Sequence, residues 1–196
     1  MMVSVTIMEE IDVLKQSLLK APIIWKGEYP YFIHPITDGV PRLEPNVLDA
    51  IIELSFRLIN WENIDLILGI EAMGLPLIAP LSMRTNIPMV IARKRQYELE
   101  GEIEVNQKTG YSKGNLFLND IRPGEKIAII DDVISTGGTI RSVIEGVKRT
   151  GALIESIVVV VEKGVGMKML QNDYPNIKFD SLVKVEMDGE TVHILD

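Results

Sequence analysis

Residues 127–139, with the sequence IAIIDDVISTGGT, constrain the fold of this chain more than any other stretch. Four apolar residues open it, and a short apolar run of this kind is typical of a strand buried on both faces in a parallel sheet. Two carboxylates, Asp131 and Asp132, follow directly. We expect them at the strand end, just before a loop of small residues and a helix over residues 140–149. The stretch therefore predicts a strand–loop–helix unit.

The loop after the acid pair has the composition of an anion site. Ser135, Thr136 and Thr139 can donate hydroxyl hydrogen bonds. Gly137 and Gly138 allow the backbone to curl closely around an anion because they have no Cβ. The helix that follows presents unpaired N–H groups and the positive end of its dipole, which attract phosphate. We interpret the loop as a phosphate-binding loop.

The acid pair makes this interpretation more specific. Carboxylates repel a phosphate, but they accept hydrogen bonds from sugar hydroxyls. A ligand with a phosphate at one end and a diol at the other, such as a ribose 5-phosphate, suits both halves of the stretch. The Walker A pattern G-x-x-x-x-G-K-[ST] and the dinucleotide pattern G-x-G-x-x-G are both absent. The alternative is an ordinary turn before a capped helix.

Composition narrows the class of protein. A chain of 196 residues suits one α/β domain, and its 46% hydrophobic and 24% charged residues are ordinary for a globular protein. The net charge of −8 disfavours non-specific nucleic-acid binding. The absence of cysteine excludes disulfides, a thiol nucleophile and cysteine metal sites, and two histidines leave no histidine metal cluster. With no signal peptide and no apolar run of about 18 residues, we expect a cytoplasmic protein with no membrane partner.

Strand and helix patterns alternate along the rest of the chain. Short apolar runs predict strands at 64–70, 88–93 and 154–161, and helical spacing predicts helices over 5–20, from Pro45, from about Leu75 and, weakly, over 166–172. The tail alternates apolar and polar residues around Asp188-Gly189, which we interpret as a two-residue hairpin turn. This order predicts a mostly parallel sheet with right-handed crossovers, whose ligands bind at the carboxyl ends of the strands.

Four further segments could take part in such a site. Residues 71–74 follow a strand and precede a helix, so they are a second possible anion site. Residues 93–95 are three adjacent cations directly after a strand, which favours anion binding over a merely solvated face. Residues 25–41, rich in aromatics and proline, form no long regular element and either cover a ligand or pack on the core. Residues 96–115 are polar and indicate a mobile loop or ribbon, such as an active-site lid.

IIDDVISTGGT resembles the phosphoribosyl-diphosphate (PRPP) motif of type I phosphoribosyltransferases. The segments GEYPYFIHPITDGVP, EAMGLPLIAPLS, IARKR and TGYSKG are similar to archaeal-type hypoxanthine/guanine phosphoribosyltransferases, and the layout also resembles adenine phosphoribosyltransferases. The resemblance runs roughly from Trp25 to Lys163. It implies one α/β domain over 1–196: a mostly parallel central sheet flanked by helices, a small hood at 22–44, a flexible lid loop at 96–115 and a C-terminal hairpin at 181–196.

The resemblance also implies roles for single residues. Asp131 and Asp132 would bind the ribose hydroxyls, while the loop Ser135, Thr136, Gly137, Gly138 and Thr139 would hold the 5-phosphate. The turn Glu71, Ala72, Met73 and Gly74 would bind pyrophosphate together with Arg93 and Lys94.

The remaining implied roles concern the base, the lid and the metal. Phe32 and Ile33 would contact the purine, and Tyr111 would close over the site with the lid. Catalysis would then rest on Asp131, Asp132, Arg93 and Tyr111. Mg²⁺ would be held mainly by PRPP and water, with no direct protein ligand. The partners would be PRPP and a purine base, with no nucleic acid, and the assembly a homodimer through the N-terminal helix or the C-terminal hairpin, although core packing explains those segments equally well.

Two departures from the family pattern leave questions open. Adenine enzymes have an arginine in the pyrophosphate turn where Met73 stands, so one leaving-group cation is missing or comes from elsewhere. Bacterial and eukaryotic hypoxanthine/guanine enzymes have an acid at the position of Ser135, so the group that takes the proton of the incoming base is unidentified. Alternatives are therefore an enzyme for adenine, xanthine or a pyrimidine, and a regulator that binds PRPP as a signal.

Overall fold

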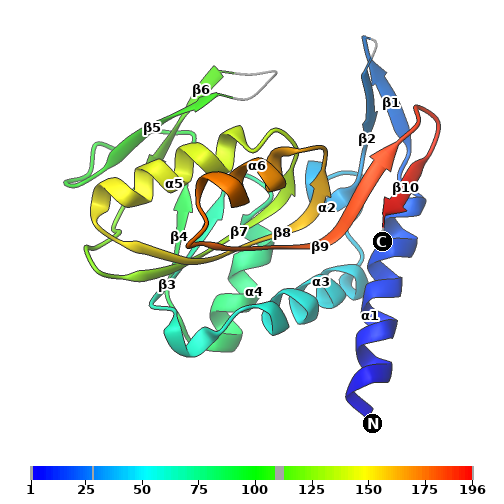
Figure 1. Ribbon diagram of the computed structural model, residues 1–196, viewed down its shortest axis with the longest axis horizontal. Coiled ribbons are helices and arrows are strands. Elements are labelled where there is room, and N and C mark those ends of the chain that lie inside the picture. The colour runs from blue at the N-terminus through cyan, green and yellow to red at the C-terminus, as the bar shows by residue number, and fades with distance from the viewer. Residues whose placement is uncertain (1, 28, 109–112, 196) are drawn as a thin grey trace.

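The computed structural model describes residues 2–27, 29–108 and 113–195. Its main strands are β3 (Leu66–Ile70), β4 (Met89–Ala92), β7 (Lys126–Ile134), β8 (Leu153–Lys163), β9 (Lys178–Met187) and β10 (Val192–Leu195). They form one six-stranded sheet in the order β10-β9-β8-β7-β3-β4 (Figure 1). Five strands are parallel to their neighbours, and β10 alone in this sheet runs antiparallel, beside β9. The prediction of a mostly parallel sheet is confirmed.

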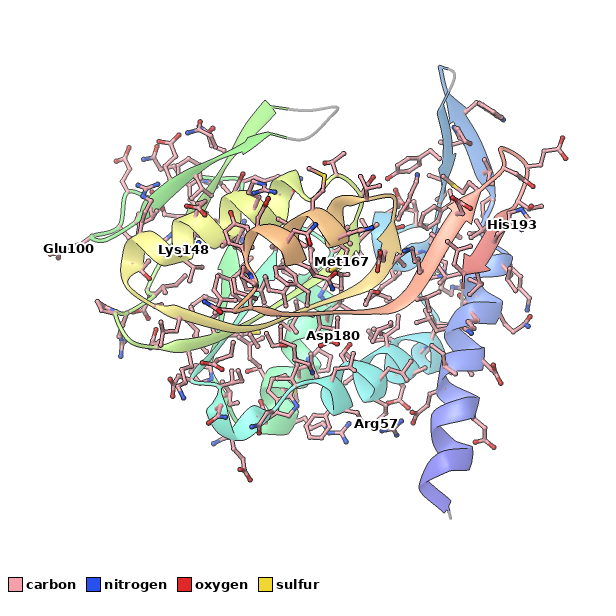
Figure 2. The ribbon with its side chains drawn as sticks, in the orientation of Figure 1. Arg57, Glu100, Lys148, Met167, Asp180 and His193 are labelled. Atoms are coloured by element: carbon pink, nitrogen blue, oxygen red, sulfur yellow. The ribbon has the colours of Figure 1, made fainter. Side chains whose placement is uncertain are left out.

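Helices cover both faces of the sheet. They are α1 (Met2–Leu19), α3 (Pro45–Leu58), α4 (Leu75–Thr85), α5 (Gly138–Thr150) and α6 (Gly166–Asp173). In Figure 1, α5 and α6 lie over one face and α3 and α4 over the other. Figure 2 marks the two layers by Lys148 and Met167 on the first and Arg57 on the second. Helix α1 packs against α3 and β10.

Strand β7 shows why this sheet has two cores. Residues 127–130 are fully buried, and successive side chains of a strand point to opposite faces. Ala128 and Ile130 accordingly join the core under α3 and α4, whereas Ile127 and Ile129 join the core under α5. Each fully buried aliphatic side chain contributes about 1.5–3 kcal/mol relative to exposure, so both layers fix the strand in place.

Two small hairpins stand outside the central sheet. Strands β1 (Ile23–Lys26) and β2 (Tyr29–Phe32) form one, followed by the one-turn helix α2 (Pro35–Asp38); β5 (Ile103–Lys108) and β6 (Lys113–Leu118) form the other. Both project from the body in the same direction (Figure 1). The prediction that residues 25–41 form no long regular element is confirmed, because β1, β2 and α2 are all short. Of the two forms predicted for residues 96–115, a loop or a ribbon, the described residues form a ribbon from Ile103 onward.

The base of the β5–β6 ribbon is packed rather than free. Val105 and Leu118 are buried against α5, and a Cβ added at Gly146 would lie 2.4 Å from the Val105 side chain. The Ser142 hydroxyl also donates to the Asn106 carbonyl at 2.8 Å. The described part of the ribbon up to Asn106 is therefore anchored to α5.

Two sequence expectations need correction. The acid pair does not follow the strand but lies inside it, because β7 continues to Ile134 and pairs with β8 over that whole length. The C-terminal hairpin is present, but its loop has four residues, since Met187 pairs with Val192. The Asp188 carboxylate accepts the N–H groups of Glu190 and Thr191, which favours this longer loop. A short 3-10 helix (Trp61–Asn63) precedes β3, and none of the described helices could span a membrane.

Candidate active site

The sequence-predicted segments come together at one edge of the sheet. The acid pair and the 135–139 loop lie at the carboxyl end of β7, the 71–74 turn at the end of its neighbour β3, and Arg93 and Lys94 after β4, the next strand along. The carboxyl ends of parallel strands are where α/β sheets bind ligands. Three segments that are far apart in sequence therefore form one site.

The acid pair is buried without a counter-ion. Asp131 is 6% exposed and Asp132 is 8% exposed, and no salt bridge reaches either carboxylate among the described residues. Burial raises the pKa of Asp131 to about 6, although the nearby Lys94 charge partly opposes this. Burial also raises the pKa of Asp132 well above its usual value, and the negative charges of Asp131 and Asp38 add to the effect. Such perturbed carboxylates in one place are typical of functional sites.

The 135–139 loop is shaped by its glycines. Gly137 has a φ of +77° and occupies the N-cap of α5, where no side chain occludes the helix end. The Gly138 N–H makes only a long hydrogen bond of 3.5 Å to the Thr136 Oγ1. The amide end of α5 and its dipole therefore face the loop, as an anion site requires.

A second glycine turn supports this loop from behind. The Gly166 N–H donates to the Ser135 carbonyl at 2.9 Å. A Cβ at Gly166 would lie 2.4 Å from the same oxygen and 2.5 Å from the Gly137 nitrogen. This contact is not among those predicted from sequence. The available signal is the Gly-Val-Gly run at 164–166 after a buried strand, which indicates close backbone approach.

The 71–74 turn also depends on a glycine. A Cβ at Gly74 would lie 2.5 Å from the Ile70 nitrogen and 3.1 Å from the Ile130 carbonyl oxygen, both backbone atoms. Only glycine fits between the ends of β3 and β7 at that point. The Glu71–Ala72 peptide bond is cis, and Met73 lies beyond it, against Gly39 of the hood.

Glu71 organises the two cations that follow β4. Its Oε2 accepts the Lys94 N–H at 2.9 Å and lies 2.9 Å from the Arg93 Nε, close as an ion pair although not aligned as a hydrogen bond. The Arg93 backbone also exchanges two hydrogen bonds with Phe117 of β6. The Glu71 carboxylate therefore holds Arg93 and Lys94 in place and links the β5–β6 ribbon to the 71–74 turn.

The hood is built around a buried phenylalanine. Phe32 is 5% exposed and belongs to the core, while the neighbouring Ile33 N–H donates to the Pro22 carbonyl at 2.8 Å. The Lys163 Nζ lies 5.9 Å from the Phe32 ring centroid, within cation–π range. Burial lowers the pKa of Lys163 to about 8. Lys163 is not among the residues predicted from sequence, because its only signal is a cation at the end of a buried strand.

His34 braces the hood against α1. Its Nδ1 accepts the Ile36 N–H at 3.2 Å and so caps α2, which leaves Nε2 to donate to the Ser17 hydroxyl at 2.8 Å. The ring is 1% exposed, and burial lowers the pKa of His34 to about 4. The neutral imidazole thus acts as a fixed structural connector. Tyr111, the predicted lid residue, lies outside the described residues.

The fold and this site define a class: an α/β protein whose strand–acid–loop–helix edge is arranged for a phosphorylated sugar. Comparison with known proteins makes the class definite, because the model of the family described as "Phosphoribosyl transferase domain" matches residues 42–190. This chain belongs to the phosphoribosyltransferase family. It is accordingly a pentosyltransferase enzyme.

Two curated relatives and two solved structures extend the comparison. The hypoxanthine/guanine phosphoribosyltransferase of Methanohalophilus mahii is 47% identical over 188 residues, covering 95% of this chain and 96% of the relative. That of Methanocaldococcus infernus is 49% identical over 180 residues, covering 91% and 98%. The adenine phosphoribosyltransferase structures from Rhodothermus marinus and Trypanosoma brucei match with TM-scores of 0.70 and 0.71 and identities of 21% and 22%. The first covers 90% of this chain and 99% of that one, and the second 88% and 79%, so these two structures speak for the fold alone.

Proposed function

We propose that this chain transfers the 5-phosphoribosyl group from PRPP to hypoxanthine or guanine, giving IMP or GMP and pyrophosphate. The observation that carries the proposal is the buried acid pair beside a helix-capping glycine loop, in a chain nearly half identical to relatives named for these bases over nine-tenths of its length. The reaction needs no covalent enzyme intermediate. A purine nitrogen attacks C1 of the ribose while pyrophosphate leaves from the opposite face.

The site residues divide between the two ends of PRPP. Asp131 and Asp132 accept hydrogen bonds from the ribose hydroxyls, and their charge stabilises an oxocarbenium-like sugar in the transition state. The amides of the 135–139 loop hold the 5-phosphate. At the other end, the 71–74 turn and the cations Arg93 and Lys94 bind the departing pyrophosphate. These roles support catalysis by positioning and electrostatics.

Magnesium fits this arrangement as a partner of the substrate. Mg²⁺ prefers oxygen ligands and keeps several waters. Among the described residues, no cluster of three or more acidic, histidine or cysteine side chains could bind it. We propose that PRPP oxygens and water hold it, with the acid pair as the nearest carboxylates. When bound, it neutralises part of the diphosphate charge. The ribbon beyond residue 106, including Tyr111, covers the site and excludes water.

Lys163 favours a 6-oxopurine over adenine. Its ammonium group can donate to the 6-oxo oxygen of hypoxanthine or guanine, whereas the 6-amino group of adenine is itself a donor. The contact with Phe32, which we propose as part of the base site, puts this cation at the hood. A hydrogen bond to a charged group contributes about 1.5–3 kcal/mol, or roughly 10- to 100-fold in rate constant. Lys163→Met is therefore expected to lower kcat/KM for hypoxanthine by that factor. The ratio of kcat/KM for hypoxanthine to kcat/KM for adenine should fall as well.

The assembly is proposed to be a cytoplasmic homodimer. The segments first considered for the contact, α1 and the C-terminal hairpin, bury much of their apolar surface within the chain: Leu14, Leu18 and Val192 are all core residues. Leu19 and Trp25 remain about half exposed at the same end. Light scattering on a sizing column measures the state directly, and a monomer that retains full activity would refute a functional dimer.

A panel of bases offered singly tests the whole proposal. The protein is incubated with PRPP, Mg²⁺ and hypoxanthine, guanine, adenine or xanthine, and nucleotide formation is followed by chromatography. We expect IMP and GMP to form at least tenfold faster than AMP. Faster AMP formation would identify an adenine enzyme, and tight PRPP binding without any nucleotide would identify a regulator.

A further inference from the structure

Asp38 is an acidic residue of the hood that has no assigned role in the proposed reaction. It is the last residue of α2, which follows Phe32 and Ile33 directly along the chain. Helix α2 contacts β7 and lies between the β1–β2 hairpin and the central sheet (Figure 1). Asp38 is half-buried. It therefore lies where the hood meets the strand that contains the acid pair.

Two further observations place Asp38 at the junction of the three parts of the site. Its negative charge contributes to the raised pKa of Asp132, so the two carboxylates interact electrostatically. The next residue, Gly39, lies against the pyrophosphate turn, since a Cβ there would be 3.4 Å from the Met73 Sδ. The bond-forming nitrogen of a purine must lie at the same junction, because it joins the base to C1 of the sugar.

The carboxylate is held in a fixed orientation and keeps acceptor capacity. The Asp38 Oδ2 accepts hydrogen bonds from the His34 N–H at 3.1 Å and the Thr37 hydroxyl at 2.7 Å. The Oδ1 accepts one from the Tyr31 hydroxyl at 3.0 Å. An ionised carboxylate offers about four lone-pair sites, two on each oxygen. One acceptor site on Oδ1 thus remains after the hydrogen bonds found among the described residues.

The other acids around the site are committed elsewhere. Asp131 and Asp132 face the sugar in the proposed function. Glu71 holds Arg93 and the Lys94 N–H. Glu162 accepts the Ser181 hydroxyl at 2.9 Å and pairs with Lys184 at 3.2 Å. Among the described residues, Asp38 is the carboxylate that remains near the proposed base site.

We propose that the Asp38 carboxylate accepts the proton that the incoming purine loses when its ring nitrogen bonds to the sugar. The inference rests on the proposed function. The nitrogen–C1 bond forms as the C1–O bond to the diphosphate breaks, and that electron pair leaves on pyrophosphate. The N–H electron pair stays on the purine, and the proton moves to Asp38 Oδ1. In the reverse reaction the protonated Asp38 returns it. Ser135, where related enzymes place an acid, then needs no ionisable group.

Asp38→Asn tests this step because asparagine keeps the shape and one acceptor but takes up no proton. Loss of a positioned general base costs about 10²- to 10⁴-fold, so kcat with hypoxanthine is expected to fall at least 100-fold. The KM for PRPP and the thermal midpoint stay near wild type. Thr37→Val is the matched control, because it removes one hydrogen bond to Asp38 and leaves the carboxylate; its kcat is expected to fall less than tenfold.

A base with a more acidic ring N–H distinguishes proton transfer to Asp38 from a purely structural role of Asp38 in the hood. The ring N–H of an 8-aza purine is more acidic than that of hypoxanthine, so its loss needs less help. Asp38→Asn is expected to lose less than tenfold in kcat with the 8-aza analogue, and Asp38→Glu to recover part of the activity with hypoxanthine. Equal losses with both bases, or a near-normal kcat with hypoxanthine, would overturn the proposal. A wild-type protein that forms no nucleotide with any base would instead refute the proposed function.

Discussion

Replacing Asp131 by asparagine is expected to stabilise the protein at neutral pH while abolishing its activity. Burial raises the pKa of this carboxyl from 3.8 to about 6, so its ionised form is less favourable in the folded than in the unfolded state. Below about pH 4 the group is protonated in both states and has no cost. Above about pH 6 the carboxyl is ionised in both states. Its ionisation then destabilises the folded state by roughly 3 kcal/mol, which corresponds to a pKa difference of about 2 between the two states.

The expected signature is a difference in pH dependence. The free energy of unfolding of the wild type should fall as pH rises from about 4 to about 6. The Asp131→Asn variant should lack the part of this fall that comes from Asp131. Between about pH 4.5 and pH 7.5 the free energies of unfolding of the two proteins should diverge by about 2 kcal/mol, with the variant more stable at the higher pH. Contributions from His34 and from the exposed acids are common to both proteins and cancel. Removal of the Asp131 charge also lowers the raised pKa of Asp132, which adds to the divergence in the same direction.

Urea unfolding followed by circular dichroism at several pH values measures this directly. Asp12→Asn is the matched control, because Asp12 is an exposed acid on α1; it should follow the wild-type curve. Parallel curves for wild type and Asp131→Asn would refute the reasoning, because they would mean that Asp131 is solvated or neutralised in the folded protein. A variant that is less stable at every pH would do the same.

Two other substitutions separate chemistry from loop shape. Asp132→Asn is expected to lower turnover by orders of magnitude with the fold intact, and near-full activity would remove the acid pair from the mechanism. Gly166→Ala puts a Cβ 2.4 Å from the Ser135 carbonyl oxygen, so it is expected to cost about 1–3 kcal/mol in stability and to raise the KM for PRPP at least tenfold in steady-state assays. Ile51→Val, a core change costing about 0.5–1.5 kcal/mol, should leave that KM unchanged; an equal rise in both variants would mean that general destabilisation is the cause.

The parts of the site that could be predicted from sequence are those determined within a few residues. The apolar run at 127–130, the acids and the glycine loop form one local unit, so pattern alone predicted strand β7 and helix α5 on either side of the loop. Even there the strand end was placed too early. Strand β7 runs on to Ile134 because β8 continues beside it, and a pairing partner is not visible in a local pattern.

What sequence could not supply are contacts between segments. Glu71 was assigned to the pyrophosphate turn, but its carboxylate holds Arg93, which lies in a neighbouring strand connection. Gly166 supports a loop some thirty residues earlier in the chain. The sequence around Phe32 does not indicate that its ring is almost fully buried or that Lys163 lies over it. Each of these depends on which strands become neighbours, and strand order is a property of the whole sheet.

The buried acid pair lowers the stability of the free protein, and the proposed reaction gives a physical reason for it. Two adjacent carboxylates with little solvent and, among the described residues, no salt bridge destabilise the fold at neutral pH. Structural requirements alone would favour apolar side chains at these positions of a central strand. A sugar that becomes positively charged in the transition state would compensate the pair where water cannot. In the proposed reaction this electrostatic cost is recovered as tighter binding of the transition state, so we expect a stabilising substitution at Asp131 to lower activity.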